Sequence, residues 1–171
     1  TDKTLLTSRI NALPAAGSTA GQIGIAWGWY MLPPDFGYLW PSESQPAAYG
    51  ADDLLKIAVL MTDGEFNTPY CNGVIAADAG SGSGSANDKI NCNATNGDPF
   101  AQAAALCAGM KAEGVIVYTV GFDISDNDDV VNVLTNCATS PAHAKLADNG
   151  GDLQTVFRQI AVEISNLRVA R

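Results

Sequence analysis

The chain has 171 residues, of which 47% are hydrophobic, 16% charged and 8% aromatic, a composition that excludes disordered, collagen-like and coiled-coil chains. With 9 Lys and Arg against 18 Asp and Glu, the formal net charge is -9, which argues against nucleic acid as a partner. No apolar run in the sequence approaches the roughly 20 residues that a membrane-spanning helix needs. We therefore expect one globular domain with no membrane segment in this chain.

The first third of the chain predicts two helices and an aromatic loop. Apolar residues recur at helical spacing over residues 5–13 and stop at Pro14, which predicts a short amphipathic helix. A second helix, from about residue 19 to 32, is apolar almost all round, so we expect it to be buried. Prolines and aromatic residues then fill residues 33–50, which is typical of an ordered loop packed on the body. Tyr38 and Trp40 in this loop are candidates for a partner surface.

The rest of the chain alternates between apolar runs of strand length and helical patterns. Such alternation predicts an α/β domain with three layers, a doubly wound, mostly parallel sheet and right-handed crossovers. Asp98 precedes one helix as a cap, and Gly114 closes it. The expected strands are 56–62, 115–122 and 145–147, and the expected helices are 98–114, 126–137 and 152–168.

Residues 65–98 interrupt this alternation, because they have no periodicity and contain a Gly-Ser run at 80–85. Connections of this length without secondary structure are usually functional or mobile. We expect an insertion that leaves the strand at its carboxyl end and forms a rim or lid there. A disulfide between Cys71 and Cys92 would staple this insertion and reduce its ordering entropy.

The four cysteines form no C-x-x-C pair, and with His143 as the only histidine they do not resemble a zinc site. Spacing favours Cys71 with Cys92 and Cys107 with Cys137, although four cysteines allow three connectivities and four buried thiols are the alternative. An even number of cysteines suggests an oxidising compartment outside the cytoplasm.

A candidate cation site combines Asp63, directly after the most apolar strand, with the hydroxyl of Thr19 at a helix start. Ligands of open α/β sheets bind at the carboxyl ends of the strands, and Mg²⁺ prefers oxygen ligands. The alternative is structural, with Asp63 as a turn former and Thr19 as a helix cap. The acidic group Asp123, Asp126, Asp128 and Asp129 departs from the EF-hand pattern and is interpreted as a helix start. His143 is read as a surface or capping residue.

Three segments, in this order and spacing, resemble the later two-thirds of a von Willebrand factor A (vWA) domain: 17–19 (Gly-Ser-Thr), 59–64 (Val-Leu-Met-Thr-Asp-Gly) and 114–122. Residues 25–32, 62–67 and 164–168 resemble, more narrowly, the TadG-related proteins of bacterial Flp/Tad pilus assembly. The resemblance covers essentially the whole chain, which is then a single partial domain, residues 1–171, with the insertion at about 65–98.

The resemblance implies a metal-ion-dependent adhesion site built from three loops. Thr19 matches the Thr of the second loop and Asp63 the Asp of the third, with Ser18 and Glu65 as secondary candidates. The first loop, D-x-S-x-S, occurs nowhere in this sequence, so the resemblance places it ahead of Thr1. The implied cofactor is a divalent cation, Mg²⁺ first and Mn²⁺ or Ca²⁺ as alternatives, with weakened affinity in this chain. A longer protein would have room for an N-terminal membrane anchor.

The function so implied is a non-enzymatic interaction module in Flp/Tad pilus assembly or surface adhesion. Its partner would be a pilus or envelope protein, in the periplasm or cell envelope of a Gram-negative bacterium. Two alternatives are a metal-dependent hydrolase that uses Asp63 and Glu65, and a structural scaffold with a vestigial metal site. The sequence has no nucleophile motif that would support hydrolysis by a serine or cysteine. It also has no P-loop lysine that would support nucleotide binding.

Overall fold

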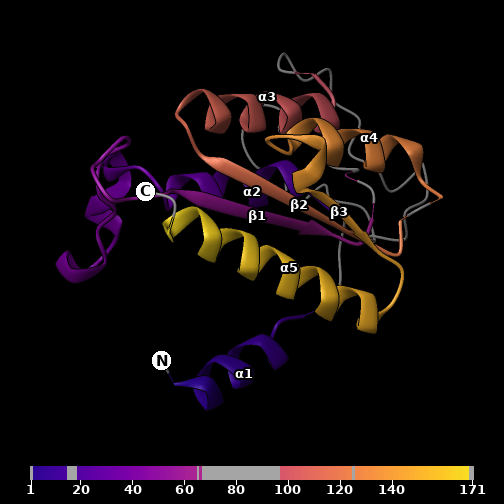
Figure 1. Cartoon of the computed structure of the whole chain (residues 1–171), viewed down its shortest axis with the longest axis horizontal. Helices are drawn as coiled ribbons and strands as arrows, with labels where there is room; N and C mark the ends of the chain where they lie inside the picture. Colours follow the sequence, from indigo (N-terminus) through magenta and orange to yellow (C-terminus); the bar gives the residue numbers. More distant parts are fainter. Residues whose placement is uncertain (1, 15–18, 65, 67–96, 125, 170–171) are drawn as a thin grey trace.

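The computed structural model describes residues 2–14, 19–64, 66, 97–124 and 126–169, and these are arranged in three layers (Figure 1). The middle layer is a parallel sheet in the order β1-β2-β3, formed by β1 (Ile57–Thr62), β2 (Ile116–Phe122) and β3 (Ala144–Ala147). Helices α2 (Gly21–Tyr30), α3 (Pro99–Ala112) and α4 (Asp128–Cys137) pack on one face, and α5 (Gly150–Val169) packs on the other. The predicted three-layer α/β class with a parallel sheet is confirmed.

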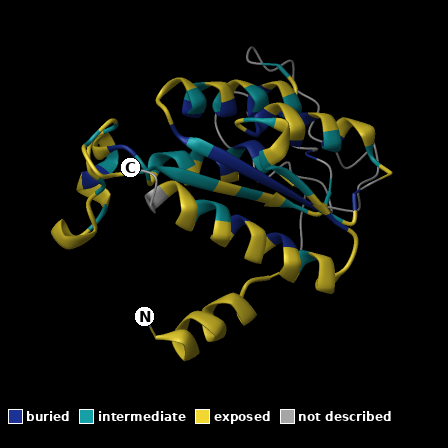
Figure 2. Ribbon diagram, in the orientation of Figure 1, coloured by how far each residue is buried: buried dark blue, intermediate teal, exposed yellow. Residues whose placement is uncertain are grey.

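Strand β2 is the centre of the sheet. It pairs with β1 from Ile116 opposite Ile57 to Gly121 opposite Thr62, and with β3 from Thr119 opposite Ala144. Because helices cover both of its faces, Val117, Tyr118 and Val120 are all buried (Figure 2). This two-sided cover explains why the strand is a continuous apolar run in the sequence. The Thr119 hydroxyl on this strand donates a hydrogen bond to the Leu134 carbonyl at 3.0 Å.

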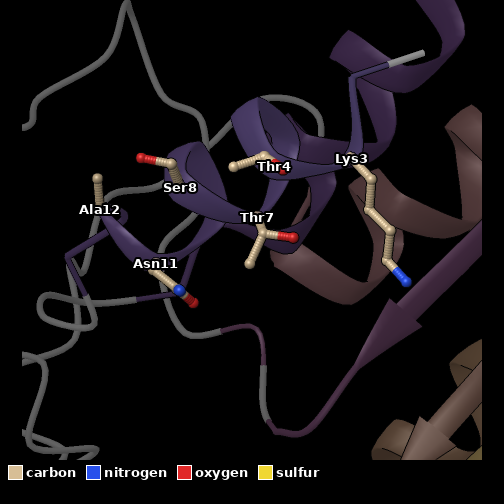
Figure 3. Close-up of a pocket in the computed structure, with 6 residues that line it drawn as sticks. All are labelled: Lys3, Thr4, Thr7, Ser8, Asn11 and Ala12. Atoms are coloured by element: carbon tan, nitrogen blue, oxygen red, sulfur yellow. The ribbon is translucent and has the colours of Figure 1, made fainter.

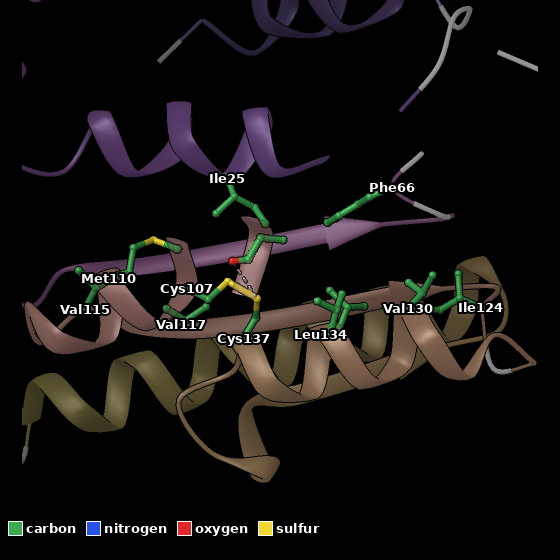
Figure 4. Close-up of a cluster of buried hydrophobic side chains, with 12 residues drawn as sticks. Ile25, Phe66, Cys107, Met110, Val115, Val117, Ile124, Val130, Leu134 and Cys137 are labelled. Carbon is green, nitrogen blue, oxygen red and sulfur yellow. Dashed lines mark hydrogen bonds between the residues drawn. A yellow bond between two sulfur atoms is a disulfide. The ribbon is translucent and has the colours of Figure 1, made fainter. Parts of the chain in front are cut away.

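The larger core lies between the sheet and the three helices α2, α3 and α4. A disulfide joins Cys107 of α3 to Cys137 of α4 within this core, and both residues are buried (Figure 4). The predicted pairing of these two cysteines is confirmed. Cys71 and Cys92 lie outside the described residues. The core side chains around the disulfide come from all three helices, β2 and the residues just beyond the strand ends, and include Ile25, Phe66, Met110, Val115, Val117, Ile124, Val130 and Leu134.

The smaller core lies under α5, where Val156 and Ile160 pack on Tyr118 and Val120. The single helix leaves part of this face open. On β1, Val59 is 40% exposed and Met61 is 47% exposed, and among the described residues β1 pairs only with β2. The face of the sheet under α5 is therefore covered over β2 and partly uncovered over β1.

Helix ends follow the expected capping chemistry with one difference. The Asp98 carboxylate accepts a hydrogen bond from the Ala101 backbone N–H at 2.8 Å, and Gly114 has a positive φ of 77° just beyond α3. Helix α4 begins at Asp128, and its cap is Asn127, whose side chain accepts from the Val130 N–H. The predicted start at Asp126 is therefore two residues early.

Two expectations about the first helices need correction. Helix α2 is not buried all round: Gln22 and Ile25 are buried, whereas Trp27 and Met31, the residue after the helix, are exposed. Only one side of α2 packs on α3 and β1, so its apolar composition does not reflect burial. Helix α1 (Lys3–Asn11) forms where an amphipathic helix was predicted, but none of its residues is buried and it stands apart from the sheet (Figures 1 and 2).

The aromatic segment from Pro33 to Gly50 contains two short 3-10 helices, η1 (Pro34–Leu39) and η2 (Ser42–Ser44). Lys56 attaches it to the body, because its ammonium group donates to the carbonyls of Leu32 and Ala47 and lies 5.1 Å from the ring centre of Tyr49. Burial lowers the pKa of this lysine. The segment is an ordered loop anchored to the body, as the sequence predicts. None of the described helices is long and apolar enough to cross a membrane.

Candidate site at the carboxyl edge of the sheet

The three parallel strands end at one edge, and the Thr-Asp-Gly motif forms the turn that follows β1. The Thr62 hydroxyl accepts a hydrogen bond from the Gly64 N–H at 3.3 Å and lies 3.1 Å from the Gly64 carbonyl oxygen. This side chain closes the turn across Asp63, the residue between them. Asp63 is exposed at the tip of the turn. The turn thus presents the carboxylate to solvent at the edge where ligands of α/β sheets bind.

Thr19 lies at the same edge, because the start of α2 packs against the segment that follows β1. The ring of Phe66 is packed directly on Gly21, and a Cβ atom at Gly21 would overlap it. Phe66 also stacks on Phe100 of α3, with ring centres 5.7 Å apart, and is buried. Glycine at position 21 is therefore required by this close approach. The contact brings the first turn of α2 beside the Thr-Asp-Gly turn.

The structure thus places the two principal candidates, Thr19 and Asp63, at one edge of the sheet, and both are exposed. The secondary candidates Ser18 and Glu65 lie outside the described residues. So does nearly all of the predicted insertion at 65–98, of which Phe66, Gly97 and Asp98 are described. The rim or lid and the metal ligation stay predictions.

The strand ends share a feature that the sequence analysis did not identify: each strand is followed directly by an aspartate. Asp63 follows β1, Asp123 follows β2 and Asp148 follows β3, and all three are exposed. Asp123 has a positive φ of 54°, and its N–H donates to the Ala147 carbonyl at 2.9 Å, which joins the ends of β2 and β3. The signal was present in the sequence, because each of the three predicted strands is followed directly by an Asp.

These aspartates make the edge acidic but do not form a metal cage. Among the described residues, no group of three or more His, Cys, Asp or Glu side chains is placed to hold a metal ion. A carboxylate from Asp63 and a hydroxyl from Thr19 are hard oxygen donors of the kind that Mg²⁺ binds. Two such donors fit part of a coordination shell, and the remaining ligands would have to come from water or from other residues.

Of the four aspartates expected at a helix start, Asp123 instead follows β2 and Asp126 precedes the Asn127 cap. Asp128 and Asp129 lie in the first turn of α4, where negative side chains interact favourably with the helix dipole. The His143 ring packs edge-on against Tyr118, with ring centres 4.5 Å apart, and its Nδ1 lies 2.6 Å from the Ser140 hydroxyl. Burial raises the pKa of Tyr118, and the nearby carboxylate of Glu163 adds to the rise. The Glu163 carboxylate is paired with Lys145 at 3.0 Å.

A separate hollow of about 640 Å³ lies beside α1 (Figure 3). Its described lining comes from one face of this single helix, and no titratable cluster faces it. We assign it no chemistry. The lining residues are Lys3, Thr4, Thr7, Ser8, Asn11 and Ala12.

Comparison with known proteins identifies the fold. No protein-family model matches the sequence, and no curated protein matches it. The structure is similar to the vWF domain of the type V pili tip protein Mfa5 from Porphyromonas gingivalis, with a TM-score of 0.59 and 17% identity over 96% of this chain and 73% of that chain. It is also similar to the pilus adhesin SpaC from Lactobacillus rhamnosus GG, with a TM-score of 0.55 and 19% identity over 86% of this chain.

The chain spans 19% of the SpaC chain, so it corresponds to a small part of that adhesin. At these identities the likeness establishes architecture. The sequence resemblance and the Mfa5 domain agree on it: the chain has the α/β fold of a von Willebrand factor-type domain.

Proposed function

We propose that this chain is a non-enzymatic protein-interaction module of vWA type that engages its partner at the carboxyl edge of the sheet, through a divalent cation held in part by Thr19 and Asp63. The observation that supports the proposal is the packing of Phe66 on Gly21, which brings the start of α2 beside the segment that follows β1. Ser18 and Glu65 are secondary ligands in this proposal. An acidic side chain of the partner fills the open coordination position.

The setting of the proposal is bacterial pilus assembly or surface adhesion. Both structural neighbours are pilus proteins by name, a tip protein and an adhesin. The buried disulfide between Cys107 and Cys137 supports a location outside the cytoplasm, where disulfides persist. Within this setting, the TadG-like sequence motifs support a role in Flp/Tad pilus assembly, with a pilus or envelope protein of a Gram-negative bacterium as the partner.

The cation part of the proposal can be tested with Mn²⁺, whose paramagnetism broadens NMR signals near its binding site even when affinity is weak. We expect Mn²⁺ to broaden the amide signals of Thr19 and Gly64, and Mg²⁺ to compete for the same site. Asp63→Ala should abolish the effect, and Thr19→Val should weaken it about tenfold through the loss of one oxygen ligand. Asp148→Ala, which removes an exposed aspartate after another strand of the same sheet, is the matched control.

Unchanged broadening in Asp63→Ala would contradict the proposal, as would broadening centred on Asp123 or Asp148. The partner's role can be tested with a short peptide that contains glutamate. Its binding should require Mn²⁺ and should be lost in Asp63→Ala. Binding that survives this substitution would favour a scaffold with a vestigial metal site. Loss of a metal-dependent hydrolysis in Glu65→Gln would favour a hydrolase. No observation among the described residues supports that alternative.

A further inference from the structure

A second candidate surface lies at the opposite end of the molecule from the carboxyl edge. Helix α2 starts at the carboxyl edge, so its last turn and the following η1 segment lie at the amino ends of the strands (Figure 1). Four aromatic rings from these two elements contact one another in sequence. Ring centres are 5.7 Å apart for Trp27 and Tyr30, 4.4 Å for Tyr30 and Phe36, and 6.4 Å for Phe36 and Tyr38. We call these four residues the aromatic row.

The aromatic row is open to solvent at both ends. Trp27 is 54% exposed and Tyr38 is 76% exposed, and Met31 and Leu39 beside them are also exposed. The two central rings, Tyr30 and Phe36, are partly buried and stacked face to face, which fixes the geometry of the row. Exposed aromatic residues that are held rigidly cost little entropy on binding and are enriched at interaction surfaces.

The segment that carries the row has charges of one sign only. Residues 19–55 contain four acidic residues, Asp35, Glu43, Asp52 and Asp53, and no Lys, Arg or His. All four are exposed, and Asp35 lies in η1 directly before Phe36. The next basic residue, Lys56, is turned inward onto the carbonyls of Leu32 and Ala47. The row therefore belongs to a segment, residues 19–55, whose charged side chains are all acidic, and Asp35 is directly adjacent to one of its rings.

Aromatic faces and carboxylates together attract cations. The negative face of an aromatic ring binds an ammonium or guanidinium group, and a nearby carboxylate adds Coulomb attraction. Tyr49 of this segment already makes one such contact, because the ammonium of the neighbouring Lys56 lies 5.1 Å from its ring centre. We infer that the aromatic row is a docking surface for a Lys- or Arg-bearing segment of a partner protein, with its cations over Trp27 and Tyr38 and beside Asp35.

This surface is independent of the cation site at the other end of the sheet. The chain would then carry two contact regions, one that takes an acidic group through a metal and one that takes a basic segment directly. Binding at the aromatic row requires no divalent cation, so it persists in EDTA. That condition separates the two proposals, because either can fail without the other.

The test uses the full chain and a hexapeptide that alternates Arg and Gly. The chain has 3 tryptophans, so its indole N–H signals in an NMR spectrum give an internal comparison. Trp27 belongs to the row, whereas the Trp29 indole donates to the Tyr49 hydroxyl at 2.8 Å and Trp40 follows η1. We expect the peptide to shift the Trp27 signal saturably, with small changes at Trp29. The same peptide with citrulline in place of Arg, which has the shape without the charge, should bind about tenfold more weakly.

Substitutions distinguish ring faces from simple apolar area. Trp27→Leu and Tyr38→Leu retain an apolar side chain and, at exposed positions, should fold normally. Each substitution should weaken peptide binding about three- to tenfold. The peptide-induced shifts of the backbone amide signals of η1 measure this binding. Asp35→Asn should weaken binding by a smaller factor and reduce its salt dependence. Phe157→Leu, which removes an exposed ring on α5 outside the row, is the control and should leave binding unchanged.

Three outcomes would overturn the inference. Equal binding of the Arg and citrulline peptides would show that the positive charge of the peptide does not contribute to binding. Unchanged binding in both leucine variants would remove the role of the rings. Peptide-induced shifts confined to Gly64, Asp123 and Asp148 would mean that the peptide binds the acidic carboxyl edge instead.

Discussion

The two faces of the sheet are covered unequally. Three helices and a disulfide cover one face, where Val117 of β2 is 0% exposed, whereas α5 alone covers the other, where Val59 of β1 is 40% exposed. Burial is the main source of stabilising free energy, so the first face should dominate the free energy of unfolding. The second face keeps apolar side chains at the surface over β1. The predictions that follow test how far this division of roles holds.

The largest effect should come from the disulfide on the covered face. Replacing both Cys107 and Cys137 by Ala removes a link across a sequence separation of 30 residues. The unfolded chain then gains conformational entropy, and we expect the free energy of unfolding to fall by about 3–4 kcal/mol. Urea unfolding followed by circular dichroism measures the loss. A loss below about 1 kcal/mol would show that packing alone holds α3 to α4.

The sharpest comparison uses the same substitution on neighbouring strands. Val117→Ala removes two buried methyl groups from the three-helix face and should cost about 2 kcal/mol. Val59→Ala removes the same groups from a half-exposed position under α5 and should cost about 0.5 kcal/mol. Urea unfolding of the two variants side by side measures the difference. Equal costs would contradict the partial exposure of β1 under α5.

A smaller effect concerns two aspartates that cap helices with the same chemistry. The Asp98 side chain accepts a hydrogen bond from Ala101 at the start of α3, and the Asp2 side chain accepts one from Leu5 at the start of α1. Asp98→Ala should cost about 1 kcal/mol, because α3 is part of the core. Asp2→Ala should leave the midpoint of thermal unfolding unchanged, because α1 contributes no buried side chain. A measurable shift for Asp2→Ala would reveal packing of α1 in solution.

The smallest effect is expected at alkaline pH on the α5 face. Burial raises the pKa of Tyr118 above its ordinary value of about 10. The unfolded chain therefore loses this proton first as pH rises, so the contribution of Tyr118 to stability is complete below about pH 10 and declines above it. Tyr118→Phe should make the decline shallower, measured as unfolding free energy at several alkaline pH values. An identical pH profile in the two proteins would assign the decline to other groups, such as Tyr49, whose pKa burial also raises.

The sequence predicted the elements whose apolar pattern and end signals are local. Strand β2 was recognisable because cover on both faces makes it uniformly apolar, and Asp98 and Gly114 marked the ends of α3 because capping is local. Helix α2 was misjudged because an apolar composition does not specify how many neighbours a helix has. Its exposed Trp27 belongs to a surface, and that follows only from the position of η1.

The candidate site was predictable in part. Asp63 and Thr19 were found from local motifs and the resemblance, and their shared edge follows from parallel strands. The packing of Phe66 on Gly21 joins residues 45 positions apart in the sequence, and no local pattern indicates such a contact. The aspartates after β2 and β3 were visible in the sequence, but only the alignment of strand ends reveals that they share an edge with Asp63.

Helix α1 has a consequence for the way the chain opens in solution. A helix of 9 residues without buried side chains is only marginally stable in water. The free energy needed to nucleate the helix exceeds the free energy gained from its few hydrogen bonds. Its amide protons should therefore exchange with solvent at rates close to those of an unstructured peptide, while those of β2 exchange only when the whole domain unfolds. Trypsin should cut after Lys3 and Arg9 in the native protein, and the folded remainder should survive that cleavage intact.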